Sequence, residues 1–216
     1  MKMNNFTIVR NPVIQKIGLK LHNVDTSVHR YREYCKLLGE YMAIDLAQRD
    51  ILPTKIETTR TPLGKLESKT IDDKKIGIVN VLRAGTSMAL GMGEVFRDSP
   101  IAFVSAWRKK ENGKMIADTD YTRGVKDLKD KFVIITDPAL ATGVSILACI
   151  DICKEYIDSK RLVICCLHAA QEGIDSIGNE YPEVHIYSVF GPNPLNEKAY
   201  IINGPGDCGD RCFNTM

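Results

Sequence analysis

The residue types best suited to chemistry lie in one short run, residues 137–145, where an acid is followed by small residues, a Thr-Gly pair and a serine. The small residues Ala141, Thr142 and Gly143 let backbone N–H groups approach an anion, and Ser145 stands where a helix is expected to begin. Residues 132–135, which precede the acid, are apolar without alternation, as in a parallel strand buried on both faces. The run therefore predicts a strand, a phosphate loop and a helix.

This loop is not one of the two commonest nucleotide-binding signatures, because it has no Gly-x-Gly-x-x-Gly spacing and no Gly-Lys-Ser/Thr. Its order of residues resembles the phosphoribosyl-diphosphate (PRPP) loop of type I phosphoribosyltransferases. Pro138 replaces the second acid of that pattern, and Asp-Pro-Ala-Leu-Ala-Thr-Gly resembles the form found in uracil phosphoribosyltransferases. Val144 departs from the family, in which a second glycine is usual. Taken alone, an ordinary buried strand with a turn remains the alternative.

A second apolar strand, residues 75–82, ends in Arg83-Ala84-Gly85 before a small-residue helix expected over residues 88–96. A guanidinium and exposed amides in such a turn suit a pyrophosphate. Leu-Arg-Ala-Gly also resembles the pyrophosphate loop of the same family. The alternative is that Arg83 pairs with a surface carboxylate.

A third strand, residues 101–107, leads into a charged segment with Asn112-Gly113 at its turn, a strong hairpin signal. A solvated loop is the ordinary interpretation. Its place at the carboxyl end of a strand is nevertheless where open α/β sheets put ligands. The resemblance implies that Arg108 contacts the diphosphate and that this segment is a mobile arm.

A helix is expected over residues 146–157, and further strands over 161–167 and 184–190. His168 ends the first of these strands. A histidine there with no carboxylate partner in the pattern is more often structural than catalytic, although the following Ala-Ala-x-Glu-Gly-Ile also resembles the family.

The carboxyl segment, residues 195–213, carries glycines and a proline around Asp207 and Asp210. It lacks the alternating ligands of a calcium loop. Its Leu-Asn-x-x-x-Tyr-Ile-x-x-Gly-x-Gly-Asp-x-Gly-Asp-Arg order resembles the uracil-binding end of uracil phosphoribosyltransferases. Asn203 and Cys208 depart from the family's usual proline and alanine or larger apolar residue, which leaves the pocket size open.

In the amino-terminal part, residues 11–21 form an apolar-rich arm, and Asp25, Thr26 or Ser27 can cap a following helix. The apolar spacing over residues 28–46 predicts one buried helical face. Residues 51–70 contain prolines and a glycine among alternating residues, which suggests short edge strands joined by a turn.

The chain of 216 residues has 44% hydrophobic residues and a formal charge of +2, which is ordinary for a soluble domain and gives no broad basic field for nucleic acid. No apolar signal core or stretch of membrane-spanning length is present, so we expect a cytoplasmic protein. The seven cysteines form no Cys-x-x-Cys pair, which predicts reduced structural thiols.

Together, these motifs predict an α/β type I phosphoribosyltransferase fold: an open, mostly parallel sheet flanked by helices, with a β-hairpin arm. One domain would span residues 1–216, with a base-binding hood from the amino-terminal arm and roughly residues 190–216. The resemblance implies transfer of phosphoribosyl from PRPP to uracil, giving uridine monophosphate (UMP) and diphosphate. It also implies magnesium on the diphosphate, a homodimer or homotetramer, and GTP as a candidate effector, with no nucleic-acid or membrane partner.

The resemblance assigns catalysis to Asp137, Arg108 and Asp207. The implied PRPP-binding residues are Arg83, Arg108, Asp137, Pro138, Ala139, Leu140, Ala141, Thr142, Gly143, Val144, Ser145 and Asp207. The implied uracil-binding residues are Ile201, Gly206, Asp207 and Cys208.

Two other functions remain open. A regulator on the same fold could sense PRPP or a pyrimidine, but the sequence shows no helix-turn-helix domain or basic stripe for nucleic acid. A phosphoribosyltransferase for another base is disfavoured by Pro138 and by the Gly-Asp-Cys-Gly-Asp end.

Overall fold

The computed structural model describes residues 5–111 and 114–215, with the backbone alone described for residues 108–111 and 114–115. The predicted Asn112-Gly113 turn lies outside the described residues, as does the side chain of Arg108.

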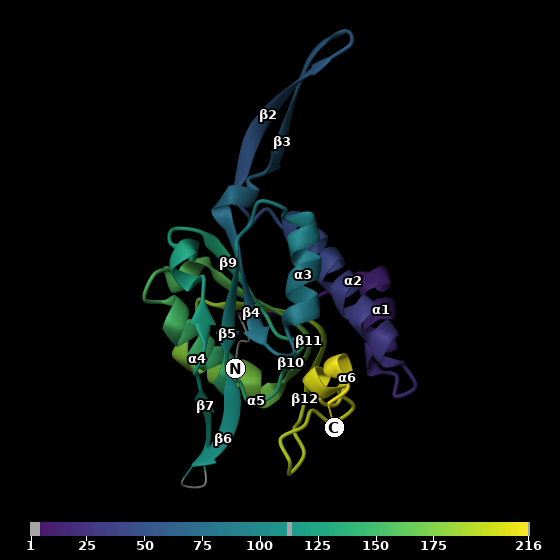
Figure 1. Ribbon diagram of the computed structural model, residues 1–216, viewed down its shortest axis with the longest axis vertical. Coiled ribbons are helices and arrows are strands. Elements are labelled where there is room, and N and C mark those ends of the chain that lie inside the picture. Colours follow the sequence, from purple (N-terminus) through teal and green to yellow (C-terminus); the bar gives the residue numbers. More distant parts are fainter. Residues whose placement is uncertain (1–4, 112–113, 216) are drawn as a thin grey trace.

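The centre of the molecule is an eight-stranded sheet in which the predicted phosphate-loop strand, β9, is paired on both sides (Figure 1). β9 lies between β4 and β11 and is parallel to both, with Thr136 opposite Asn80 on one side and Cys165 on the other. Among the described strand pairs of this sheet, only the pairing of β8 with β5 is antiparallel. The order is β1 (Phe6–Ile8), β12 (His185–Asn193), β11 (Leu162–Ala170), β9 (Phe132–Thr136), β4 (Ile76–Leu82), β5 (Ile101–Ser105) and β8 (Thr122–Arg123), with β10 (Ala139–Leu140) also paired to β11.

Helices cover both faces of this sheet (Figure 1). One apolar cluster joins the sheet to α1 (Pro12–His22), α2 (Val28–Ala47) and α3 (Thr86–Val95), and the other joins it to α4 (Val144–Cys153) and α5 (Gln171–Glu180). Neighbouring residues of β9 point into different clusters, since Ile134 belongs to the first and Ile135 to the second. The prediction of a strand buried on both faces is confirmed.

Several other elements differ from their predicted form. The expected arm at residues 11–21 is the helix α1, because the Asn11 side chain accepts bonds from the Val13 and Ile14 amides and Pro12 supplies a compatible first turn. α4 ends at Cys153 instead of residue 157, where turn bonds from Tyr156 and Ile157 converge on the Cys153 carbonyl.

The predicted strands joined by a turn are present as β2 (Thr54–Thr61) and β3 (Gly64–Ile71), but they are eight residues long and form a separate hairpin that projects from the body (Figure 1). The predicted strand over residues 101–107 is also divided. β5 ends at Ser105, and β6 (Trp107–Glu111) pairs with β7 (Lys114–Asp118) in a second projecting hairpin.

The described part of the chain also contains three short 3₁₀ turns: η1 (Asp73–Lys75), η2 (Val125–Leu128) and η3 (Ser159–Arg161). The chain closes with α6 (Cys208–Phe213), a helix that the sequence analysis did not assign. All seven cysteines are buried and unbridged, in agreement with the predicted structural thiols. No helix of the described chain has the length and apolar character needed to cross a bilayer.

Candidate active site

A pocket of about 430 Å³ opens at the carboxyl ends of β4, β5 and β9, where parallel α/β sheets place their ligands. Four separate segments contribute its walls, and three of them are the motifs identified in the sequence. The lining residues are Val81–Ala84, Ser105–Trp107, Asp137, Ala139–Gly143, Ser145, Ile146, Tyr200, Ile201 and Gly206–Gly209. Residues far apart in the chain therefore meet at one cavity.

The loop between β9 and α4 has the geometry of an anion cradle. Gly143 has a φ of 88°, which favours glycine, and it occupies the N-cap of α4. Glycine brings no side chain to the first amides of the helix, and a helix start attracts negative charge. The Thr142 hydroxyl is buried and finds no hydrogen-bond partner among the described residues. A phosphate oxygen would supply that partner.

Main-chain contacts fix this loop from behind. The Pro138 carbonyl accepts bonds from the Leu167 and His168 amides of β11 at 2.9 and 3.1 Å. Gly173 of α5 packs so closely that a Cβ there would lie 2.5 Å from the Ala141 carbonyl oxygen. The loop is thus held between a strand and a helix by backbone atoms.

Asp137 lines the pocket directly after β9 and is partly buried. Its Oδ1 accepts a hydrogen bond from the Ala139 amide at 3.2 Å, and its own amide donates to the Cys165 carbonyl at 3.3 Å. These bonds orient the carboxylate at the mouth of the phosphate loop, as the sequence predicted.

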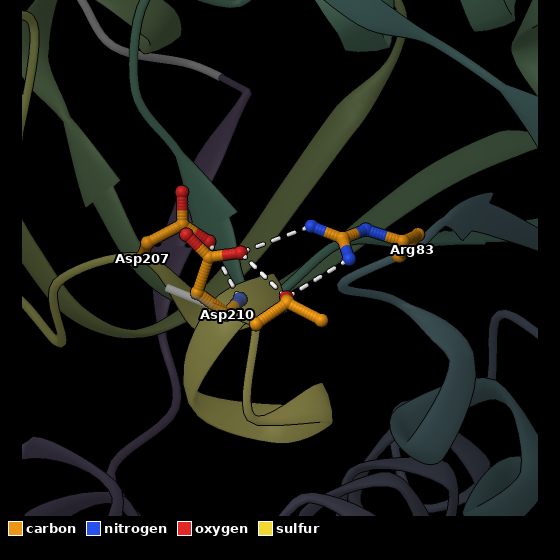
Figure 2. Close-up of polar contacts among 4 residues, drawn as sticks. Arg83, Asp207 and Asp210 are labelled. Carbon is orange, nitrogen blue, oxygen red and sulfur yellow. Dashed lines mark hydrogen bonds and ion pairs between the residues drawn. The ribbon is translucent and has the colours of Figure 1, made fainter.

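Arg83 lines the pocket, as expected for a pyrophosphate-binding turn, and it also pairs with a carboxylate, as in the alternative interpretation. Its Nη2 donates to Asp210 Oδ1 at 3.0 Å and its Nη1 donates to Thr215 Oγ1 at 3.0 Å (Figure 2). The Arg83 side chain is 56% exposed, so water weakens this ion pair. The partner carboxylate belongs to the carboxyl segment and is not a remote surface acid.

The carboxyl segment forms the opposite wall, and Ile201, Gly206, Asp207 and Cys208 all line the pocket. Asp207 caps α6, because its Oδ1 accepts a hydrogen bond from the Asp210 amide at 2.9 Å (Figure 2). Gly206 has a φ of 75°, a conformation that side chains disfavour. Burial raises the pKa of the Cys208 thiol to about 12, so that the thiol stays neutral at physiological pH.

Two residues of the implied PRPP set do not line the pocket. Pro138 is buried and contributes its carbonyl to β11, and Val144 begins α4. The backbone of Arg108 lies in β6 beside Trp107 and pairs with Ala117. Its implied contact with diphosphate remains a prediction.

Sequence reasoning missed Ser105, Ala106, Trp107 and Tyr200, which all line the pocket. Trp107 is the single tryptophan of the chain, and it follows the carboxyl end of β5. Its position after the carboxyl end of a parallel strand could have marked it as a pocket residue. Tyr200 directly precedes Ile201, yet its type alone did not mark it.

His168 does not line the pocket. The Nδ1 of His168 lies 2.8 Å from Nε2 of His22, and the Nε2 of His168 lies 2.8 Å from Asn193 Oδ1. His22 in turn donates a hydrogen bond from its Nδ1 to the Gly18 carbonyl. Burial lowers the pKa of both histidines. The network joins α1 to β11 and β12, which agrees with the structural interpretation of His168.

The open, mostly parallel sheet flanked by helices has the fold of the type I phosphoribosyltransferases. Within that class, the chain belongs to the uracil phosphoribosyltransferase family, whose family model, "Uracil phosphoribosyltransferase", matches residues 8–215. The resemblance stated from the sequence is confirmed.

Similar proteins match almost the whole chain. A uracil phosphoribosyltransferase of Dictyoglomus thermophilum is 35% identical over 208 residues, covering 96% of this chain and 98% of the relative. One from Limosilactobacillus reuteri is 33% identical over 214 residues, covering 99% and 100%. The solved structure of the AQ2163 protein from Aquifex aeolicus is 30% identical, with a TM-score of 0.88 and coverage of 98% and 99%.

Proposed function

We propose that this protein transfers the phosphoribosyl group of PRPP to uracil, giving UMP and diphosphate. The observation that carries the proposal is the single pocket in which the phosphate loop, Arg83 and the carboxyl segment meet. Full-length membership of the uracil phosphoribosyltransferase family supports the choice of base.

The reaction forms a bond from uracil N1 to the anomeric carbon, with inversion, as the bond from that carbon to the diphosphate breaks and the N1 proton is released. Because the sugar becomes oxocarbenium-like, catalysis depends on positioning the reactants, stabilising the leaving group and excluding water. The pocket is suited to positioning, since four separate segments of the chain contribute to its walls.

Each wall has a proposed task. The loop of residues 141–145 holds the 5-phosphate through its amides and the Thr142 hydroxyl. Asp137 accepts hydrogen bonds from the ribose hydroxyls, and Asp207 lies beside the base and the ribose. Main-chain groups of Ile201 and residues 206–208 read the uracil edge.

Arg83 binds the diphosphate together with Arg108. Its guanidinium donates hydrogen bonds to Asp210 and Thr215, so diphosphate must compete with the Asp210 carboxylate. An exposed ion pair of this kind is worth only about 0–1 kcal/mol. The exchange is therefore easy for a ligand that offers several phosphate oxygens.

Magnesium fits the chemistry of this site. Mg²⁺ prefers oxygen ligands and commonly binds one or two carboxylates plus substrate phosphates. Asp137 and Asp207 are the acids that line the pocket in the described chain, so they are the protein groups available to the ion or to its waters. When bound, the ion would neutralise charge on the leaving diphosphate. Homo-oligomer formation and an effect of GTP stay predictions.

The test is incubation of the purified protein with PRPP, magnesium and, separately, uracil, cytosine, adenine and hypoxanthine. We expect UMP from uracil and at most traces of nucleotide from the other bases. Nucleotide formation with a purine but not with uracil would contradict the proposal. Binding of PRPP without transfer to any base would favour a sensing role.

A further inference from the structure

Arg211, a residue of α6 outside the pocket wall, links the base-binding segment to the amino-terminal helices. Its guanidinium donates to three main-chain carbonyls: Leu21 at 2.5 Å, Asn23 at 2.6 Å and Pro205 at 2.8 Å. Its Cζ also lies 4.5 Å from the centre of the Tyr31 ring. One side chain thus contacts α1, the turn after it, α2 and the carboxyl segment.

These contacts are of strong types. Hydrogen bonds from a charged donor are stronger than neutral ones, and a cation over an aromatic face adds attraction. Leu21 lies in the last turn of α1, where unpaired carbonyls and the helix dipole favour a positive charge. Tyr31 is fully buried, so the surface beneath the guanidinium is fixed.

The carbonyl of Pro205 directly precedes Gly206, Asp207 and Cys208, which line the pocket. Cys208 is itself buried, and it lies near enough to Tyr31 and Arg211 for both to lower the pKa of its thiol against the larger effect of burial. Displacing the Pro205 carbonyl would therefore shift the wall that faces the base.

The phosphate end of the pocket has different supports. The Pro138 carbonyl is held by β11 amides, and the Ala141 carbonyl rests against Gly173 of α5. The hydrogen bonds of Arg211 and its contact with the Tyr31 ring involve neither of these groups. The loss of Arg211 should therefore weaken binding of the base and leave binding of the phosphate unchanged.

We propose that Arg211, stacked on Tyr31, is a positioning residue that holds residues 206–208 in the position needed to bind the nucleobase. It acts through the Pro205 carbonyl and does not touch the substrate. The assignment rests on the proposed function for the identity of the base, and it adds a residue that governs base affinity without governing phosphate affinity.

The experiment uses the fluorescence of Trp107, the single tryptophan, which lines the pocket. The full-length protein is titrated with UMP, which carries base, ribose and phosphate, and separately with ribose 5-phosphate, which lacks the base. The variants are Arg211→Met, which keeps an apolar stem but no donor, and Arg211→Lys, which keeps the charge but loses the fork. Thermal melting checks that each variant is folded.

We expect Arg211→Met to raise the Kd for UMP by about tenfold or more, as for the loss of one charge-assisted hydrogen bond or more. The Kd for ribose 5-phosphate should stay within about twofold of wild type. Arg211→Lys should recover part of the lost affinity, because a single ammonium can still reach some of the carbonyls. If Arg211→Met does not fold, Arg211→Lys must show the same difference: a raised Kd for UMP and an unchanged Kd for ribose 5-phosphate.

Arg32→Met is the matched control, because Arg32 Nε also donates to a main-chain carbonyl of α6, that of Cys212 at 2.6 Å, beyond the pocket wall. It should leave both dissociation constants within about twofold of wild type, because Arg32 is an exposed residue and its contact lies away from the ligand. An equal effect of the Arg211 variants on both ligands, or none on either, would overturn the proposal. Wild-type protein that binds UMP no better than ribose 5-phosphate would instead refute the base site itself.

Discussion

The two walls of the pocket are built in opposite ways. The phosphate loop lies between a central strand and a helix, and main-chain atoms of β11 and α5 support it. The carboxyl segment has little regular structure before α6, and side chains hold it: Asp207 caps the helix, Asp210 meets Arg83, and Arg211 reaches the amino-terminal helices. A wall held by backbone should be sensitive to added bulk, whereas one held by side chains should be sensitive to lost polar groups.

The largest effect is expected from Gly173→Ala, which adds a Cβ 2.5 Å from the Ala141 carbonyl oxygen and 2.9 Å from Leu140 Cγ. The phosphate loop must move, and a misplacement of about 1 Å can cost about 100-fold in rate. Steady-state kinetics should show kcat/KM for PRPP falling by about that factor. Gly178→Ala is the control on the same helix, because its Cβ would meet Asn5 at an ordinary 3.5 Å. Equal activity of the two variants would contradict a backbone-held loop.

Asp137→Asn should come next, because it keeps the shape at the end of β9 and removes the charge. A charge-assisted hydrogen bond contributes about 1.5–3 kcal/mol, so kcat/KM should fall by about one to two orders of magnitude. The melting temperature should change little. Wild-type turnover in this variant would remove Asp137 from the reacting site.

A smaller effect is expected from Asp210→Asn, which removes the carboxylate that pairs with Arg83 across the two walls. Because diphosphate no longer competes with that charge, its affinity should rise by up to about fivefold, the size of an exposed ion pair. Titration of magnesium diphosphate, followed by Trp107 fluorescence, measures the change. Weaker binding would mean that Asp210 orients Arg83 for the ligand instead of competing with it.

The smallest effect is expected from Cys208→Ala, since the main chain of this residue is assigned to base recognition and its thiol is buried. Cytosine presents a donor where uracil presents an acceptor, so fixed main-chain groups should keep the preference at about two orders of magnitude. The ratio of kcat/KM for uracil and cytosine gives the result. A lost preference would assign base recognition to the thiol.

Much of the pocket could be predicted from local sequence. The apolar strands, the small residues after Asp137 and the Arg83 turn all lie within runs of about ten residues, and their resemblance to one family assigned them to one site. The interaction of Arg83 with a carboxylate was also anticipated as an alternative. What could not be predicted was that Asp210, 127 residues away along the chain, would supply that carboxylate.

The sequence by itself determined the strand, loop and helix units, because the hydrophobic periodicity and the turn residues that specify them lie within each segment. Tertiary structure alone decided the β2–β3 projection, the histidine network and the role of Arg211. Each depends on how separate elements meet: Arg211 and Leu21 are 190 residues apart along the chain, yet one hydrogen bond joins them. An arginine in a Gly-Asp-Arg run has no preferred partner until folding brings unpaired carbonyls to it, since such groups must be satisfied wherever they become buried.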